Sequence, residues 1–210
     1  MKKIGIADGP TSVFVLKKNS KLTLKQKIQR MKYNMKRAYV EKTLSTQSHS
    51  MDEVIDYIKN VYEFIEADAD SRDVLEEYKE LRASFLIRYE PELLGEFVAI
   101  PQLKSTDDED VKRFLERSKQ RSEKAMEIPI SDFDIDFHKY TKNFGDEDGE
   151  MHFIIEKKYG YIGGGVSGNK KLLKKFERLQ KDIFKYFGVS KEDIETKSER
   201  YKDIVRALSR

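Results

Sequence analysis

The sequence contains no cysteine, only four prolines among its 210 residues, and only three histidines. The absence of cysteine excludes disulfide bonds, thiolate zinc sites and cysteine nucleophiles. No run of about 18 or more apolar residues occurs, so no segment is suited to cross a bilayer as a helix. With so few histidines, a catalytic acid and base would have to come from residues far apart in the sequence. We therefore expect a cytoplasmic protein that has no membrane partner.

Charge is abundant and unevenly distributed. Charged residues make up 38% of the chain, which helices with solvated outer faces would explain. Residues 17–42 contain ten Lys or Arg and one acid, whereas residues 52–80 contain eleven acids and three bases. These two blocks could simply pair with each other in neighbouring helices. Residues 157–181 contain eight bases and one acid, have no comparable acidic helix next to them in the sequence, and are the better candidate for an anionic partner.

Several segments have apolar residues at every third or fourth position, which predicts amphipathic helices. Three such segments lie between residues 24 and 89, and we expect their apolar stripes to be core. Ser50 is placed to cap the second of them. A heavily charged helix is expected at about 109–126. Two helices are expected after residue 170, the first stopping at Gly188 and the second opened by Ser190 and Asp193 as a capping box.

Alternation of apolar and polar residues predicts the strands. Residues 3–6 and 12–16 flank a turn and predict a small hairpin. Strands are also expected at 133–138, 152–156 and 161–166.

The predicted fold class is α+β. We expect an N-terminal β-hairpin with a helical layer, then a three-stranded antiparallel meander backed by two C-terminal helices. The regions expected are 1–103 and 104–210, and whether they share one core is left open.

The segment from Gly5 to Val15 contains Ala7-Asp8-Gly9-Pro10-Thr11-Ser12. It resembles the Ala-Asp-Gly-Pro-Thr-Ser motif of the β subunit of sodium-translocating carboxylate decarboxylases. The resemblance implies that Asp8 maps onto an intramembrane residue implicated in ion movement. Because the chain has no apolar span, we do not expect the pump function here. The motif is either a structural turn or an exposed loop in which Asp8, Gly9 and Thr11 hold an ion or a small ligand.

A glycine-rich run, Gly163 to Lys171, lies where a strand meets a helix. It lacks the Lys and the Ser or Thr of a nucleotide P-loop. The order helix, three strands, helix over residues 109–187 resembles the double-stranded-RNA-binding domain, whose last helix begins with lysines that contact phosphates. The alternative is that the glycines only ease the packing of strand and helix. The candidate anion-binding residues are Lys158, Ser167, Lys170, Lys171, Lys174, Lys175 and Arg178.

Three carboxylates and an imidazole, Asp132, Asp134, Asp136 and His138, are expected along one face of a strand. Alternate residues of a strand lie about 6 to 7 Å apart, so one cation could bridge two of them with help from another strand. Oxygen ligands suit magnesium, manganese or calcium. The alternative is a solvated strand face paired with lysines.

The sequence thus favours a soluble, non-catalytic binding or regulatory protein, whose basic helix face meets a nucleic acid, a nucleoprotein or an acidic protein. One alternative is a metal- or ligand-binding enzyme that uses the Asp8–Thr11 loop or the Asp132–His138 row. Another is a structural interaction subunit. A divalent metal ion is the one cofactor that the residues suggest.

Overall fold

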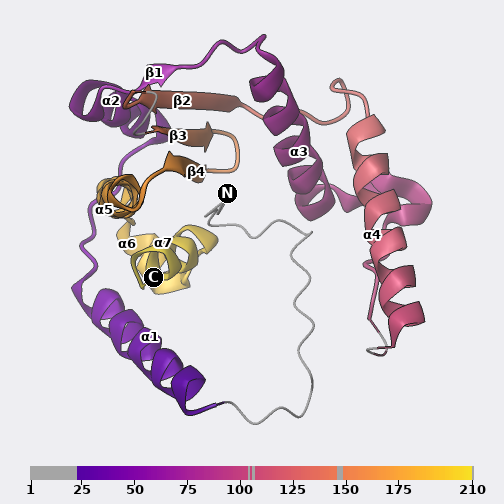
Figure 1. The fold of residues 1–210 in the computed structure, drawn as a ribbon, viewed down its shortest axis with the longest axis horizontal. Coiled ribbons are helices and arrows are strands. Elements are labelled where there is room, and N and C mark those ends of the chain that lie inside the picture. Colours follow the sequence, from indigo (N-terminus) through magenta and orange to yellow (C-terminus); the bar gives the residue numbers. More distant parts are fainter. Residues whose placement is uncertain (1–22, 104, 106, 146–148, 210) are drawn as a thin grey trace. The chain divides into compact units, whose positions relative to one another are not determined.

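The computed structural model describes residues 23–103, 105, 107–145 and 149–209, and its mixture of helices and one sheet confirms the α+β class (Figure 1). These residues form two compact units. We call residues 23–67 and 137–209 the sheet unit and residues 68–136 the helical unit. The boundary expected between residues 103 and 104 falls inside the helical unit. The predicted N-terminal hairpin lies outside the described residues.

The sheet unit combines four strands and five helices among its described residues. Its helices are α1 (Leu24–Thr43), α2 (Met51–Tyr62), α5 (Lys170–Phe187), α6 (Lys191–Thr196) and α7 (Glu199–Ser209). Its strands are β1 (Ile65–Glu66), β2 (Phe137–Asn143), β3 (Gly149–Glu156) and β4 (Tyr161–Gly168).

The sheet is antiparallel throughout, in the order β1-β2-β3-β4. The sequence predicted three strands, and β1 is too short for an alternation pattern to reveal it. The strand predicted at 133–138 is wrong in its first half, because β2 begins only at Phe137. Phe133 and Ile135 are nevertheless buried, so their alternation with aspartates reflects an irregular segment that turns two side chains inward.

One hydrophobic core joins the early helices to the C-terminal half of the chain. Phe153 of β3 and Phe176 of α5 are fully buried and stack with ring centroids 5.3 Å apart. Val54 and Ile58 of α2 and Ile204 of α7 belong to the same cluster. The predicted stripe of α2 is therefore core, as the spacing indicated.

The predicted core stripe of α1 is exposed, which contradicts the expectation drawn from its spacing. Of this helix only Val40 is buried, close to its C-terminal end. Helix α1 packs against α7, and α7 in turn packs against α5 (Figure 1).

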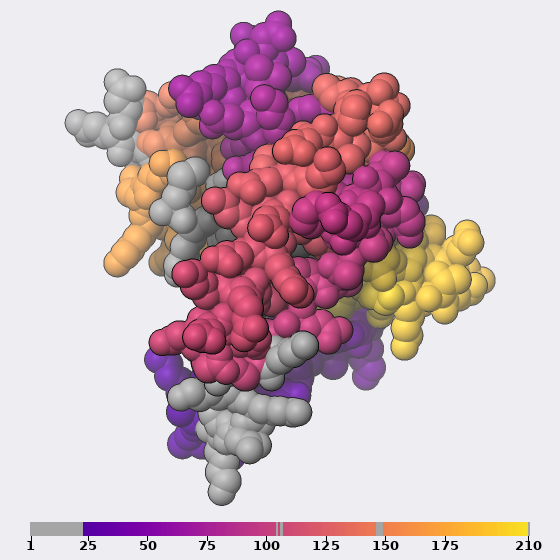
Figure 2. Space-filling view, turned by 90° about the vertical axis from the view of Figure 1, so that its right-hand side faces the viewer, coloured from indigo at the N-terminus to yellow at the C-terminus, as the bar shows by residue number. Residues whose placement is uncertain are grey.

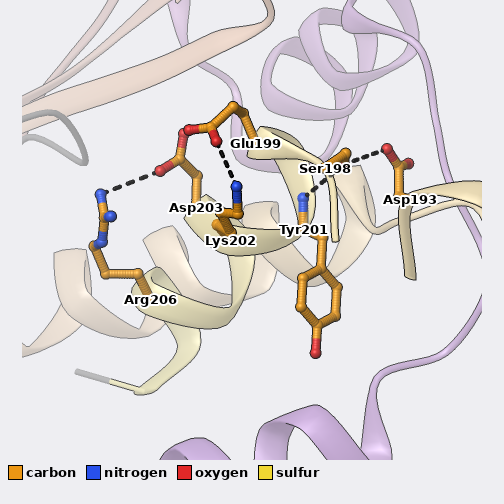
Figure 3. Close-up of polar contacts among 7 residues, drawn as sticks. All are labelled: Asp193, Ser198, Glu199, Tyr201, Lys202, Asp203 and Arg206. Atoms are coloured by element: carbon orange, nitrogen blue, oxygen red, sulfur yellow. Dashed lines mark hydrogen bonds and ion pairs between the residues drawn. The ribbon is translucent and has the colours of Figure 1, made fainter. Parts of the chain in front are cut away.

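The helix expected after Ser190 is divided into α6 and α7. Ser190 and Asp193 form the predicted capping box. The chain then adopts a left-handed conformation at Lys197, with φ 51°, which ends α6. Figure 3 shows Ser198 at the corner, where its hydroxyl donates to Asp193 Oδ1 at 2.6 Å and accepts from the Tyr201 backbone N–H at 3.2 Å. The Ser198 hydroxyl therefore accepts from one of the backbone N–H groups that the first turn of α7 leaves without a partner inside the helix.

Arg200 connects α7 by hydrogen bonds to the segment that precedes α2 and to the end of α5. Its guanidinium donates to the carbonyl oxygens of His49 at 2.8 Å, Phe187 at 2.5 Å and Gly188 at 2.9 Å. It also lies 3.7 Å from the centroid of the Phe187 ring.

The helical unit contains α3 (Arg72–Tyr89), the 3-10 segment η1 (Pro91–Phe97) and α4 (Asp108–Glu127). Figure 2 shows α4 and η1 side by side on one face. Two buried arginines hold the irregular segments of this unit. Arg82 donates to the carbonyl oxygens of Phe133, Ile128 and Pro129, each at 2.7 Å. Arg121 donates to those of Phe97 at 2.9 Å and Val98 at 3.2 Å.

Candidate anion-binding surface

Basic side chains line the solvent side of α5. The helix buries its apolar residues against the sheet, α2 and α7, and its bases recur at the three- and four-residue spacing that places them on one side. Six of these bases are exposed and Lys181 is half-buried. We call this set the α5 basic face: Lys170, Lys171, Lys174, Lys175, Arg178, Lys181 and Lys185.

The first turn of α5 is closed by a side-chain cap. Asn169 Oδ1 accepts from the backbone N–H groups of Lys171 and Leu172, each at 2.9 Å. These are the donors that an anion at a helix N-terminus would use. Recognition of an anion at α5 must therefore come from the lysine and arginine side chains.

The glycine run before α5 serves close packing. A Cβ at Gly164 would lie 2.5 Å from the backbone oxygen of His152, 3.0 Å from the Phe153 ring and 3.3 Å from the Phe176 ring. A Cβ at Gly165, on the opposite face, would lie 2.7 Å from the His152 ring. Glycine at both positions leaves the space that the neighbouring strand and rings occupy, which supports the packing interpretation of the run.

Two acids of the 52–80 block pair with bases that do not belong to the α5 basic face. Asp52 pairs with Lys157 at 2.7 Å, and Glu63 pairs with Lys142 at 2.9 Å. Within the described residues, no ion pair involves Lys170, Lys171, Lys174 or Arg178. The Lys175 ammonium lies 4.4 Å from the centroid of the Phe144 ring, a cation–π contact that leaves its charge uncompensated.

Two acids of α5, Glu177 and Asp182, adjoin its basic residues, and Glu177 is exposed whereas Asp182 is half-buried. Tyr57 Oη donates to Asp182 Oδ2 at 2.6 Å, and the Tyr62 hydroxyl donates to the same oxygen. The hydrogen bond to Asp182, together with burial, raises the pKa of Tyr57; burial, together with Asp182, raises the pKa of Tyr62. Asp182 is thus engaged by two phenols of α2 and is turned toward the protein.

One base of the first basic block, Lys36, is coupled electrostatically to one base of the second, Lys181. Burial lowers the pKa of Lys36 on α1, and so does the Lys181 ammonium on α5, whereas Glu177 acts in the opposite direction. Lys36 therefore lies within electrostatic reach of both Lys181 and Glu177 of α5. Sequence reasoning missed Lys36 and Lys185 as members of this surface; the spacing along α5 could have revealed Lys185, but no local signal pairs Lys36 with Lys181.

The remaining predicted anion-binding residues lie at opposite ends of β4. Ser167 is exposed next to the start of α5, in register with Glu150 of β3. Lys158 lies in the turn before β4, near the centroid of the Tyr159 ring at 5.2 Å. A strand of this length spans about 23 Å, so Lys158 is separated from Lys170 and Lys171.

The predicted metal-binding row is not brought together. Asp134 Oδ1 accepts from Tyr78 Oη at 2.6 Å, and Asp132 accepts from the Ser131 hydroxyl at 3.0 Å. His138 lies on β2 and meets Glu66 of β1 at 2.9 Å. Asp136 is exposed in the irregular segment before β2. Among the residues that the structure describes, no group of three His, Asp or Glu side chains is arranged to hold a metal ion.

Asp8, Gly9 and Thr11 lie outside the described residues, so the hypothesis of a ligand loop stays a prediction. In the described part of the chain, no helix combines the length and the apolar content that crossing a bilayer requires. Comparisons with protein-family models, curated proteins and solved structures found no match for this chain. The helix that the double-stranded-RNA-binding resemblance places first, α4, belongs to the helical unit, whereas the sheet and α5 belong to the sheet unit.

Proposed function

We propose that this protein is a nucleic-acid-binding protein that contacts the phosphate backbone through the α5 basic face. The observation that carries the proposal is the row of seven bases along one side of α5, none of which forms an ion pair within the described residues. A row of this kind releases counterions when it meets a polyanion, which supplies sequence-independent affinity.

The length of the row also fits a nucleic-acid backbone. Lys170 and Lys185 are separated by about 22 Å along a helix that rises 1.5 Å per residue. Phosphates on one strand of a duplex are spaced several ångströms apart, so such a row can neutralise several of them. Lys36 of α1 widens the positive surface beside Lys181.

The test is binding to short RNA and DNA duplexes across a salt series, measured by fluorescence anisotropy. The variant is Lys170→Glu, Lys171→Glu, Lys174→Glu, and the matched control is Lys79→Glu, Lys112→Glu, Lys191→Glu, which changes the net charge equally at other exposed positions. We expect the control to bind like the wild type. We expect the α5 variant to lose at least tenfold in affinity at moderate salt, with a shallower salt slope by about 0.9 for each lost phosphate contact.

Equal losses in both variants would reduce the effect to net charge and refute the assignment to α5. If the wild type bound poly-glutamate as tightly as the duplexes, the α5 basic face would be a general polyanion-binding surface, as expected for an acidic protein partner. Absence of binding by the folded wild type would refute the proposal.

A further inference from the structure

Helix α1 presents a stripe of apolar side chains to solvent. The exposed fractions are 74% for Leu24, 40% for Ile28, 56% for Met31, 66% for Met35 and 67% for Tyr39. Their spacing of three and four residues places all five on one side of the helix. We call these five residues the α1 seam. Apolar residues gathered in such a stripe, rather than scattered singly, mark an interaction surface.

The other residues that the structure describes leave the seam uncovered, because α1 is attached by a different side. Val40 is the buried residue of α1, and α7 is the element against which the helix packs. At 3.6 residues per turn, Val40 points about 140° away from the middle of the seam. The contact between α1 and α7 therefore does not involve the seam.

The width of the seam identifies the kind of surface that it suits. Its residues occupy about 80° of the helix circumference, as in the narrow seam of a helix pair. Leu24, Ile28, Met31 and Met35 alternate steps of four and three residues, which is the spacing of a and d positions in a coiled coil. A helix lying in a membrane surface has a broader apolar face with larger side chains.

The charges beside the seam indicate the sign of the charge that a partner should carry. Lys27 follows one edge of the seam, and Lys25 and Lys32 follow the other. Within α1, the single acid is Glu41, which accepts from Arg37 at 2.8 Å at the far end of the helix. A second copy of this chain would place lysines opposite lysines, which is unfavourable at the edges of a helix pair.

We infer that the α1 seam docks an amphipathic helix of another protein, and that acidic residues flank the apolar stripe of this partner helix. Methionines at two of the five positions suit this role because their side chains adapt to the surface they meet. The site differs from the α5 basic face in its residues and in the chemistry of its ligand, so each can fail without the other.

The experiment titrates the full chain into a fluorescent three-heptad peptide that has Leu at a and d and Glu at e and g. A second peptide carries Lys in place of Glu. We expect saturable binding of the Glu peptide and at least tenfold weaker binding of the Lys peptide. The double variant Ile28→Asp, Met35→Asp should lose at least tenfold in affinity for the Glu peptide. The control Gln26→Asp, Gln29→Asp, with the same charge change on the side of α1 away from the seam, should retain binding.

A charge reversal sharpens the test. The variant Lys27→Glu, Lys32→Glu should reverse the preference, so that the Lys peptide binds more tightly than the Glu peptide. Circular dichroism of each variant verifies that the helices remain. The Lys170→Glu, Lys171→Glu, Lys174→Glu variant should bind the Glu peptide like the wild type, which separates this site from the one on α5.

Three results would overturn the inference. One is equal binding of both peptides, or of neither. Another is binding to phosphatidylglycerol vesicles that Ile28→Asp, Met35→Asp abolishes, which would assign the seam to a membrane. The last is a dimer in sedimentation equilibrium that the same variant dissociates, which would assign it to a second copy.

Discussion

The sheet unit and the helical unit depend to different degrees on arginine side chains to satisfy their backbone carbonyls, and in the sheet unit Arg200 does so at one junction. In the sheet unit, strands and helices pair most of their own polar groups and an aromatic cluster around Phe153 and Phe176 fills the space between them. In the helical unit, long irregular segments are held by guanidinium groups, with Arg82 and Arg121 buried at 3% and 7% exposure. Irregular backbone that is buried needs donors from side chains, and Arg supplies several from one residue. The two units should therefore respond differently to apolar and polar substitutions.

The largest expected effect is on the sheet unit. Phe176→Ala removes a fully buried ring that stacks on Phe153, and we expect a loss of about 3–5 kcal/mol in its unfolding free energy. Because the sequence has no tryptophan, amide hydrogen exchange read by mass spectrometry is the suitable probe. Protection should fall in α2, β3 and α7. An equal fall in α3 and α4 would show that the two units unfold together.

The second effect belongs to the helical unit. Arg82→Met leaves three backbone carbonyls without their donors, and we expect a loss of about 2–4 kcal/mol, felt mainly in residues 128–133 and α4. Arg82→Lys should cost less, since an ammonium can still donate to one or two of them. Thermal unfolding and hydrogen exchange measure both. Equal stability of the Met and wild-type proteins would contradict the role assigned to the guanidinium.

Alkaline pH should lower the stability of each unit through the ionisation of a different tyrosine. Burial and Asp134 raise the pKa of Tyr78 to about 12 in the helical unit, and burial and Asp182 raise that of Tyr62 in the sheet unit. A raised folded-state pKa means that each tyrosine stabilises its unit fully below pH 10, and that this contribution declines as the pH rises toward the folded-state value. Tyr78→Phe and Tyr62→Phe should each flatten the decline in their own unit. The measurement is urea unfolding at pH 8, 10 and 11, and an unchanged decline in either variant would contradict its assignment.

The smallest effect compares two helix starts. Asn169 caps α5 with two hydrogen bonds, whereas Ser71, at the start of α3, makes no side-chain cap. Asn169→Ala should therefore cost about 1 kcal/mol and Ser71→Ala much less. Thermal melts of the two single variants give the comparison. Equal losses would show that the cap seen at Asn169 does not stabilise α5.

Local signals in the sequence predicted the helices and their caps well. Ser50 and Ser190 each accept from the backbone N–H three residues on, as their positions before acidic third residues indicated. The break at Lys197 was not predictable, because a lysine in the left-handed region has no distinctive pattern. The alternation at 133–137 was misread because a buried loop can bury every second residue as a strand does.

Tertiary placement was the part that the sequence could not supply. The apolar stripe of α1 has the same spacing as that of α2, yet one is exposed and the other is core, since periodicity shows that a face is apolar and not what covers it. The same holds for the candidate site. The lysines of α5 could be listed from the sequence. The coupling of Lys36 to Lys181, however, depends on the packing of α1 against α7 and of α7 against α5.

The three hydrogen bonds of Arg200 also have a mechanical consequence. A pulling force applied to α7 reaches the carbonyls of His49, Phe187 and Gly188 through one guanidinium, so the three bonds share the load instead of breaking in turn. The segment before α2 and the end of α5 would then come under tension at the same moment. This junction should yield in a single step, at a force higher than that needed to peel α7 away from its apolar contacts alone.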